Sequence, residues 1–125
     1  MLAATDGHAK NFSLFIGPDG QSLTPLYDVM SAAPAVQKKQ VQPKSFKMAM
    51  AVGKSRYYRM DRIDHRHWLE TAQLCRFAKS EMQSIIDEVR DRRTTALSTV
   101  DSQIPRQFPD HIWDAIRARV AMISK

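Results

Sequence analysis

The sequence predicts an α+β fold that is mainly α-helical, with two short β-hairpins ahead of a helical bundle. β-Favouring side chains over residues 12–16 and 21–26 flank the strong turn sequence Gly17-Pro18-Asp19-Gly20, which indicates the first hairpin. A second pair of short segments flanks Gly53-Lys54-Ser55. From about Asp64 the apolar residues recur at helical spacing. Strand signals and helix signals are therefore segregated along the chain.

The composition is that of one soluble globular domain: 125 residues, of which 43% are hydrophobic and 26% charged. No long apolar run indicates a membrane span, and the N-terminus lacks the regions of a secretory signal, so we expect a cytoplasmic protein. The single cysteine, Cys75, is expected to be a structural thiol. We expect one domain over 1–125, made of a loop and hairpin, a loop and second hairpin, and a helical bundle, over residues 1–33, 34–60 and 61–125.

The first residues are expected to form a loop. Small and polar residues dominate positions 3–11, and Gly7 tolerates backbone angles that other residues avoid. After the first hairpin we expect a short helix over Val29–Ala33, stopped by Pro34. Residues 35–45 are rich in Gln and Lys, which indicates an exposed loop.

The second hairpin is expected over residues 46–52 and 56–60, although residues 47–51 have weak β character and also suit a helix. A helix then follows from about Asp64. Its apolar face is expected to hold Trp68, Leu69, Ala72 and Cys75.

Two more helices complete the predicted bundle. The first opens at Ser80 and carries an apolar stripe at helical spacing, formed by Met82, Ile85, Ile86, Val89, Ala96, Leu97 and Val100. Arg93 interrupts this stripe, either with its stem along the core edge or as a contact for a partner. The last helix is expected over residues 110–124.

The candidate chemistry lies in the first loop and just after the first hairpin. Asp6 and Asn11 stand five positions apart, which is the spacing between the catalytic base and a magnesium-binding Asn in protein-kinase catalytic loops. The hairpin returns the chain so that Asp28 comes close to Asn11 and becomes a second ligand; hard oxygen ligands of this type suit magnesium. The alternative is that Asp6 merely begins an Asp-Gly turn and Asp28 caps the helix expected over Val29–Ala33.

Four segments carry a resemblance to a known family: TDGHAKNFSLFI, LTPLYDVMSAAP, KMAMAVG and HWLETAQLCRF. In this order they resemble the C-terminal part of the HipA family of bacterial serine/threonine kinases, the toxin halves of type II toxin–antitoxin pairs. The resemblance covers nearly the whole chain. It implies the C-terminal lobe of a protein-kinase-like fold, with the short hairpins near its catalytic loop.

The resemblance also implies roles for individual residues. Asp6 corresponds to the catalytic aspartate, Lys10 to a nearby cation of the catalytic loop, and Asn11 and Asp28 to ligands of Mg²⁺, with ATP as the cofactor. His8, two residues past Asp6, is a candidate from its place in the loop to position the loop or to contact phosphate, and the alternative is a satisfied loop histidine. Residues 35–45 take the place of an activation segment, and whether they bind peptide or only connect is left open.

The sequence before Asp6 does not supply a nucleotide-binding half. None of the glycines has phosphate-loop spacing ahead of the catalytic Asp, since they stand at positions 7, 17, 20 and 53. We therefore expect the chain alone to be inactive and to bind magnesium weakly. A lobe without its partner lobe exposes apolar surface, so we also expect self-association as a homo-oligomer.

The net charge of +6 fits either a solvated basic surface or a contact with nucleic acid, but the basic residues form no continuous run. The resemblance implies a HipB-like antitoxin as partner and operator DNA through that complex. Three hypotheses stay open: a separate chain supplies the N-terminal lobe, the lobe only binds antitoxin or DNA, or it is an inert remnant. Zinc at His65 and His67 is disfavoured, because residues two apart on a helix point in different directions.

Overall fold

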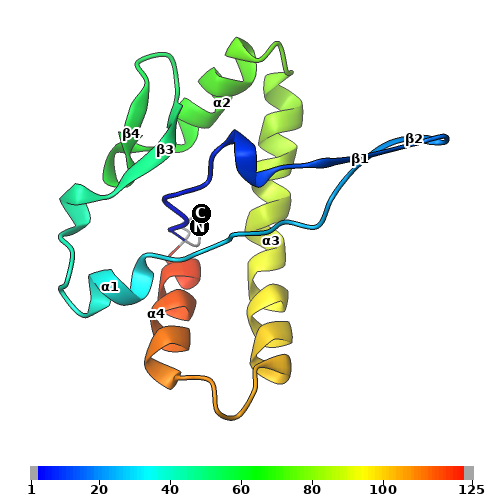
Figure 1. The fold of residues 1–125 in the computed structure, drawn as a ribbon. Helices are drawn as coiled ribbons and strands as arrows, with labels where there is room; N and C mark the ends of the chain where they lie inside the picture. The colour runs from blue at the N-terminus through cyan, green and yellow to red at the C-terminus, as the bar shows by residue number, and fades with distance from the viewer. Residues whose placement is uncertain (1–2, 123–125) are drawn as a thin grey trace.

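The computed structural model describes residues 3–122, apart from the side chain of Pro43. Its class is α+β and mainly helical, with two small antiparallel hairpins, which confirms the predicted class. Figure 1 shows the hairpins on the N-terminal half of the chain and the long helices on the C-terminal half.

The first hairpin consists of β1 (Leu14–Gly17) and β2 (Gly20–Leu23), which pair antiparallel with Gly17 opposite Gly20. The turn predicted from Gly17-Pro18-Asp19-Gly20 is confirmed, and in the structure two residues connect the paired glycines. Every residue of both strands is exposed. Figure 1 shows the hairpin projecting away from the remainder of the chain.

The helix predicted over Val29–Ala33 is wrong. The structure has irregular backbone over residues 29–32, and helix α1 spans Ala33–Gln37, with Pro34 in its first turn. Proline suits that position because the first N–H groups of a helix have no intrahelical partner and its fixed φ angle is already helical. Pro34 therefore starts a helix where a helix end was expected.

The second hairpin is confirmed, and the helical alternative for residues 47–51 is wrong. Strand β3 (Lys47–Val52) pairs antiparallel with β4 (Tyr57–Arg59), with a register irregularity between the two ends of β3. A 3₁₀ turn, Pro43–Ser45, precedes the hairpin, so the loop expected over residues 35–45 is partly helical at both ends. A further 3₁₀ turn, Met60–Arg62, follows it.

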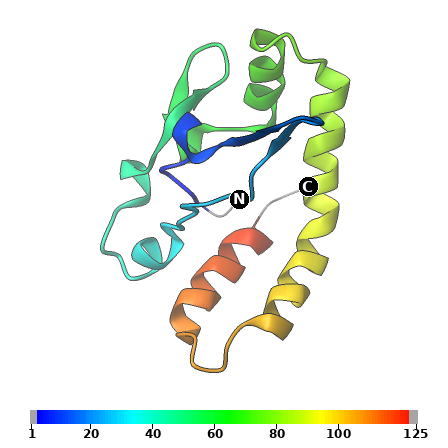
Figure 2. The same ribbon diagram turned by 45° about the vertical axis from the view of Figure 1, so that its right-hand side comes forward.

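The C-terminal half contains helices α2 (His65–Leu74), α3 (Lys79–Gln103) and α4 (Asp110–Ala121). The 25-residue α3 is the longest element, and Figures 1 and 2 show α4 returning beside its C-terminal end. The Trp113 indole Nε1 donates a 2.6 Å hydrogen bond to Asp101 Oδ1, which joins α4 to α3. Helix α1 packs on α4. The last helix was expected to reach residue 124, and residues 123 and 124 lie outside the described part of the chain.

The core over residues 3–122 is small. Its buried hydrophobic residues are mostly alanines, namely Ala3, Ala33, Val52, Ala72 and Ala115. Cys75 was expected on the apolar face of a helix, but it is exposed at the C-terminal end of α2, because the helix stops one residue earlier. None of the helices described here combines the length and apolar character that a membrane span requires.

Candidate active site at the catalytic-type loop

Asn11 and Asp28 meet across the base of the first hairpin. Asn11 lies in the 3₁₀ turn Ala9–Asn11 and is only 7% exposed. Its Nδ2 donates a 3.1 Å hydrogen bond to Asp28 Oδ2, and its Oδ1 accepts a 2.9 Å hydrogen bond from the backbone N–H of His8. Because a backbone N–H can only donate, it fixes the amide with its oxygen toward His8 and its nitrogen toward Asp28.

The backbone at Asp28 adopts an unusual conformation. Its φ angle is +56°, in the left-handed region that aspartate enters more readily than most residues. The interpretation of Asp28 as a helix cap is wrong, since residues 29–32 are not helical and α1 begins only at Ala33. At the start of α1 a hydrogen bond of the capping kind involves Ser31 instead, whose Oγ accepts a 3.2 Å hydrogen bond from the N–H of Ala33. Asp28 is exposed and directed into the site instead of being used by a helix.

Asp6 belongs to the same pocket. It occupies a turn, as the Asp-Gly interpretation predicts, and it is exposed. A pocket of about 130 Å³ is lined by Asp6, Asn11 and Asp28 together with Ala4, Gly7, Phe12, Leu26, Tyr27, Val29 and Met30. The structure therefore brings together three of the predicted site residues, two carboxylates and one amide, in an otherwise apolar recess.

His8 and Lys10 lie in sequence between Gly7 and Asn11, which line the pocket, but they do not line it themselves. Lys10 is exposed, and its backbone carbonyl accepts a 2.6 Å hydrogen bond from the Tyr27 hydroxyl. His8 is half-buried; its backbone N–H positions the Asn11 amide, while its buried Nδ1 has no hydrogen-bond partner among residues 3–122. The contact of His8 with this site thus runs through its backbone.

Tyr27 is a member of the site that the sequence analysis missed. Its hydroxyl bonds to Lys10 and also lies 2.9 Å from Ser13 Oγ, so it bridges the loop and the segment that returns from the hairpin. The only signal in the sequence was the position of an aromatic residue with a polar tip directly before Asp28.

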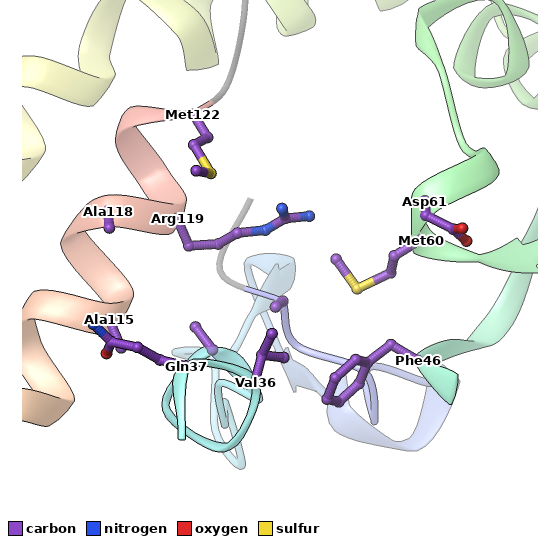
Figure 3. Close-up of a pocket in the computed structure, with 11 residues that line it drawn as sticks. Val36, Gln37, Phe46, Met60, Asp61, Ala115, Ala118, Arg119 and Met122 are labelled. Atoms are coloured by element: carbon purple, nitrogen blue, oxygen red, sulfur yellow. The ribbon is translucent and has the colours of Figure 1, made fainter. Parts of the chain in front are cut away.

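A larger cavity lies elsewhere in the fold. It measures about 280 Å³, between α1, α4 and the turn at Met60, and Figure 3 shows Arg119 reaching into it from α4. Its walls are largely apolar, and none of the predicted site residues lines it. Asp61 at its edge is paired with Arg59, whose guanidinium lies 2.6 Å from the carboxylate and lowers the pKa of Asp61. The candidate chemistry is therefore in the smaller pocket.

Of the two histidines in α2, His67 has a structural role. His67 is 2% exposed, its Nδ1 accepts a 2.9 Å hydrogen bond from the N–H of Asp64, and its ring stacks on Tyr57 at 4.0 Å. It therefore supports the start of α2 and packs that helix on the second hairpin. Over residues 3–122 no group of three or more His, Cys, Asp or Glu side chains is placed to hold a metal ion.

Some of the basic residues are neutralised locally. On α3, Arg90 lies 3.4 Å from Asp87 and Arg92 lies 3.0 Å from Glu88. These exposed pairs contribute little to stability, but they reduce the positive potential that this helix presents. They favour the solvated-surface interpretation of the net charge for α3.

The arrangement defines an α+β domain in which a loop, a hairpin and the segment after it present a carboxylate–amide site beside a helical bundle. The family model described as the HipA-like C-terminal domain matches residues 1–97, which is 97 of the 125 residues. The chain belongs to the family of HipA-like C-terminal domains. The match includes both hairpins, α2 and most of α3, and it ends before α4.

Proposed function

We propose that this chain acts as the C-terminal lobe of a HipA-like serine/threonine protein kinase toxin, which transfers the γ-phosphate of ATP to a protein serine. The single observation that carries the proposal is the convergence of Asp6, Asn11 and Asp28 on one pocket, with Asn11 and Asp28 in direct contact. Asp6 and Asn11 have kinase-loop spacing, and the membership of the chain in the family of HipA-like C-terminal domains supports the proposal.

The oxygen-bearing side chains of the pocket are of the ligand type that suits a hard divalent cation. Asn11 Oδ1 accepts one hydrogen bond and keeps a second lone pair, and Asp28 uses one oxygen for Asn11 and has the other available. Mg²⁺ is commonly held by one or two protein side chains while water and phosphate oxygens complete its shell. Asn11 and Asp28 would hold it here, and it would neutralise charge on the phosphate oxygens.

The remaining chemistry belongs to the loop. Asp6 orients the serine hydroxyl and accepts its proton as the serine oxygen bonds to the γ-phosphorus. The bond between that phosphorus and the bridging oxygen of ADP breaks, and ADP carries the electron pair away. Lys10, exposed on the same loop, adds positive charge near the phosphates.

The other parts of such a kinase have to come from other residues, in the same or another chain. No glycine-rich loop stands between Met1 and Asp6, so the element that covers the phosphates is not within these 125 residues. The proposal therefore includes an N-terminal lobe as partner, a HipB-like antitoxin, operator DNA reached through the antitoxin, and a cytoplasmic location.

The test is paramagnetic broadening of amide signals by Mn²⁺, with and without ATP, as a probe of the magnesium site. We expect selective broadening around Asp6, Asn11 and Asp28 that Asp28→Asn strongly reduces. The matched control is Asp19→Asn, which removes another exposed loop carboxylate at the tip of the hairpin and should leave the broadening unchanged. Broadening that is absent, lies elsewhere, or persists in Asp28→Asn would contradict the proposal.

A further inference from the structure

The Tyr27 hydroxyl forms the centre of a short hydrogen-bond chain. It lies 2.6 Å from the backbone oxygen of Lys10 and 2.9 Å from Ser13 Oγ. A carbonyl oxygen can only accept, so Tyr27 donates to Lys10, and Ser13 donates to a lone pair of Tyr27. The two hydrogen bonds point in one direction and strengthen each other.

This chain joins the two segments that carry the site. Lys10 and Ser13 flank Asn11 and Phe12 on the loop, whereas Tyr27 directly precedes Asp28 on the segment that returns from the hairpin. The hydrogen bonds of Tyr27 therefore hold the two segments together at points only one or two residues away from Asn11 and Asp28. A backbone hydrogen bond of 2.9 Å from Thr24 to Ser13 extends the same join toward the hairpin.

The hairpin between these segments does not fix their relative position by packing. All eight strand residues are exposed, and a two-stranded hairpin on its own is marginally stable in water. Asp28 in addition has a left-handed backbone angle of +56°, which needs support from its neighbours. Contacts at the base of the hairpin supply part of this support, and Tyr27 lies there.

We propose that Tyr27 is a positioning residue for the site. Its hydroxyl holds the loop that carries Asn11 against the segment that follows the first hairpin, and so places Asn11 opposite Asp28. The inference rests on the proposed function for its consequence, the binding of a divalent cation and phosphate. Its structural part, control of the Asn11 amide by the Tyr27 hydroxyl, stands on the contacts alone. Tyr27 also contributes to the wall of the pocket beside Asp28.

The test uses the full chain with Tyr27→Phe, which removes the hydroxyl and keeps the ring. The readout is the side-chain amide of Asn11, which is the only asparagine in the sequence and therefore readily assigned in a ¹H–¹⁵N spectrum. We expect its signals to shift and its exchange with solvent to rise several-fold. Since the lost hydrogen bonds are exposed, the melting temperature should fall by only about 2 °C.

Tyr58→Phe is the matched control. The Tyr58 hydroxyl accepts a 2.9 Å hydrogen bond from Arg56 on the second hairpin, so the change has the same chemistry away from the pocket. It should leave the Asn11 amide as in the native chain. Ser13→Ala removes one bond of the chain without altering the ring, and it should shift the Asn11 signals by less than Tyr27→Phe.

The outcomes separate this inference from the proposed function. Unchanged Asn11 signals in Tyr27→Phe overturn the inference, and so do unchanged signals in Ser13→Ala if Tyr27→Phe does not fold. Weaker Mn²⁺ broadening around Asn11 and Asp28 in Tyr27→Phe, with Tyr58→Phe unaffected, supports the link to cation binding. If the native chain shows no Mn²⁺ broadening, the proposed function fails, while the Asn11 amide still decides whether Tyr27 positions it.

Discussion

Asn11 and Asp28, 17 positions apart in the chain, are joined by a 3.1 Å hydrogen bond between a nearly buried amide and an exposed carboxylate. The other end of the amide is held by the His8 backbone. Each polar group of Asn11 is thus used by the protein, and the side chain ties the loop to the returning segment as well as facing the pocket.

Asn11→Ala should therefore destabilise the chain as well as alter the site. The substitution leaves the His8 N–H and the Asp28 carboxylate without this partner, and such losses at partly buried groups amount to about 1–3 kcal/mol. Urea denaturation of the cation-free protein measures the effect. Ser13→Ala, which removes an exposed hydrogen bond on the same loop, serves as the control and should change stability by less than about 1 kcal/mol. Equal stability of Asn11→Ala and the native chain would show that the amide contacts are not maintained in solution.

The left-handed backbone of Asp28 makes a second prediction, which compares Asp28→Gly with Asp28→Val. Both variants remove the carboxylate, but glycine accepts a φ angle of +56° and a β-branched residue does not. We expect Asp28→Val to be less stable than Asp28→Gly by about 1–2 kcal/mol, the usual penalty of a left-handed conformation. The difference in free energy of unfolding isolates the backbone term, since the lost hydrogen bond is common to both. Indistinguishable stabilities would mean that residue 28 relaxes to an extended conformation.

The parts of the fold that sequence analysis predicted correctly depend on local chemistry. The first hairpin follows from two glycines, a proline and an aspartate between alternating side chains, and the approach of Asp28 to Asn11 follows from that hairpin. The helix at residues 29–33 was misplaced because a proline marks both the end of one helix and the first turn of another. Only the later course of the chain, with α1 packed on α4, decides between them.

Contacts between distant segments were not predictable in the same way. The Tyr27 hydroxyl reaches Lys10 only because the hairpin register brings Leu14 opposite Leu23. The residue type at position 27 alone does not predict this hydrogen bond. Cys75 was placed on an apolar face by periodicity, but the helix ends before it and leaves it exposed. Periodicity specifies which residues share a face, whereas it does not specify what covers that face.

The exposed hairpin predicts self-association. Leu14, Ile16 and Leu23 lie on one face of the β1–β2 pair and are 54%, 78% and 69% exposed. Neither strand carries a charged side chain, so charge repulsion between strands does not oppose pairing of their edges or faces with another copy. Light scattering at increasing concentration should show association that Ile16→Lys reduces. Gln21→Lys adds the same charge opposite Ile16 without removing apolar surface, and it should have the smaller effect. A native chain that stays monomeric at every concentration would contradict this prediction.

The Arg59–Asp61 pair predicts a specific pH effect. The guanidinium donates hydrogen bonds of 3.0 and 2.6 Å to the two carboxylate oxygens, and these bonds lower the pKa of Asp61 below its ordinary value. The stabilising contribution is therefore fully present above the ordinary pKa of Asp and is lost as the pH falls through the lowered one. In a ¹³C titration, Arg59→Gln should move the Asp61 midpoint upward. Arg62→Gln removes only a weaker charge effect and should move it less. A midpoint in Arg59→Gln equal to that of the native chain would show that the pair is not formed.

Gly53 provides the most specific stability prediction, because the turn between β3 and β4 contacts α2 at this residue. Its φ angle is +77°, and a Cβ atom there would lie 2.9 Å from Glu70 Oε2 and 3.1 Å from His67 Cβ. The Glu70 carboxylate cannot simply move aside without loss, since it accepts a 2.9 Å hydrogen bond from the Lys54 N–H, and Gly53 itself donates a 2.8 Å hydrogen bond to Thr71 Oγ1.

Gly53→Ala should therefore destabilise the chain by about 1–3 kcal/mol, through backbone strain and overpacking against α2. Gly17→Ala is the matched control, because an added Cβ at Gly17 meets no atom within 4 Å in the part of the chain that the structure describes. The free energy of unfolding of Gly17→Ala should stay close to that of the native chain. Denaturant unfolding of the two variants gives the comparison directly. If the two substitutions change the free energy of unfolding equally, then α2 does not hold the turn after β3, and the packing of the second hairpin on that helix is looser than the contacts at Gly53 require.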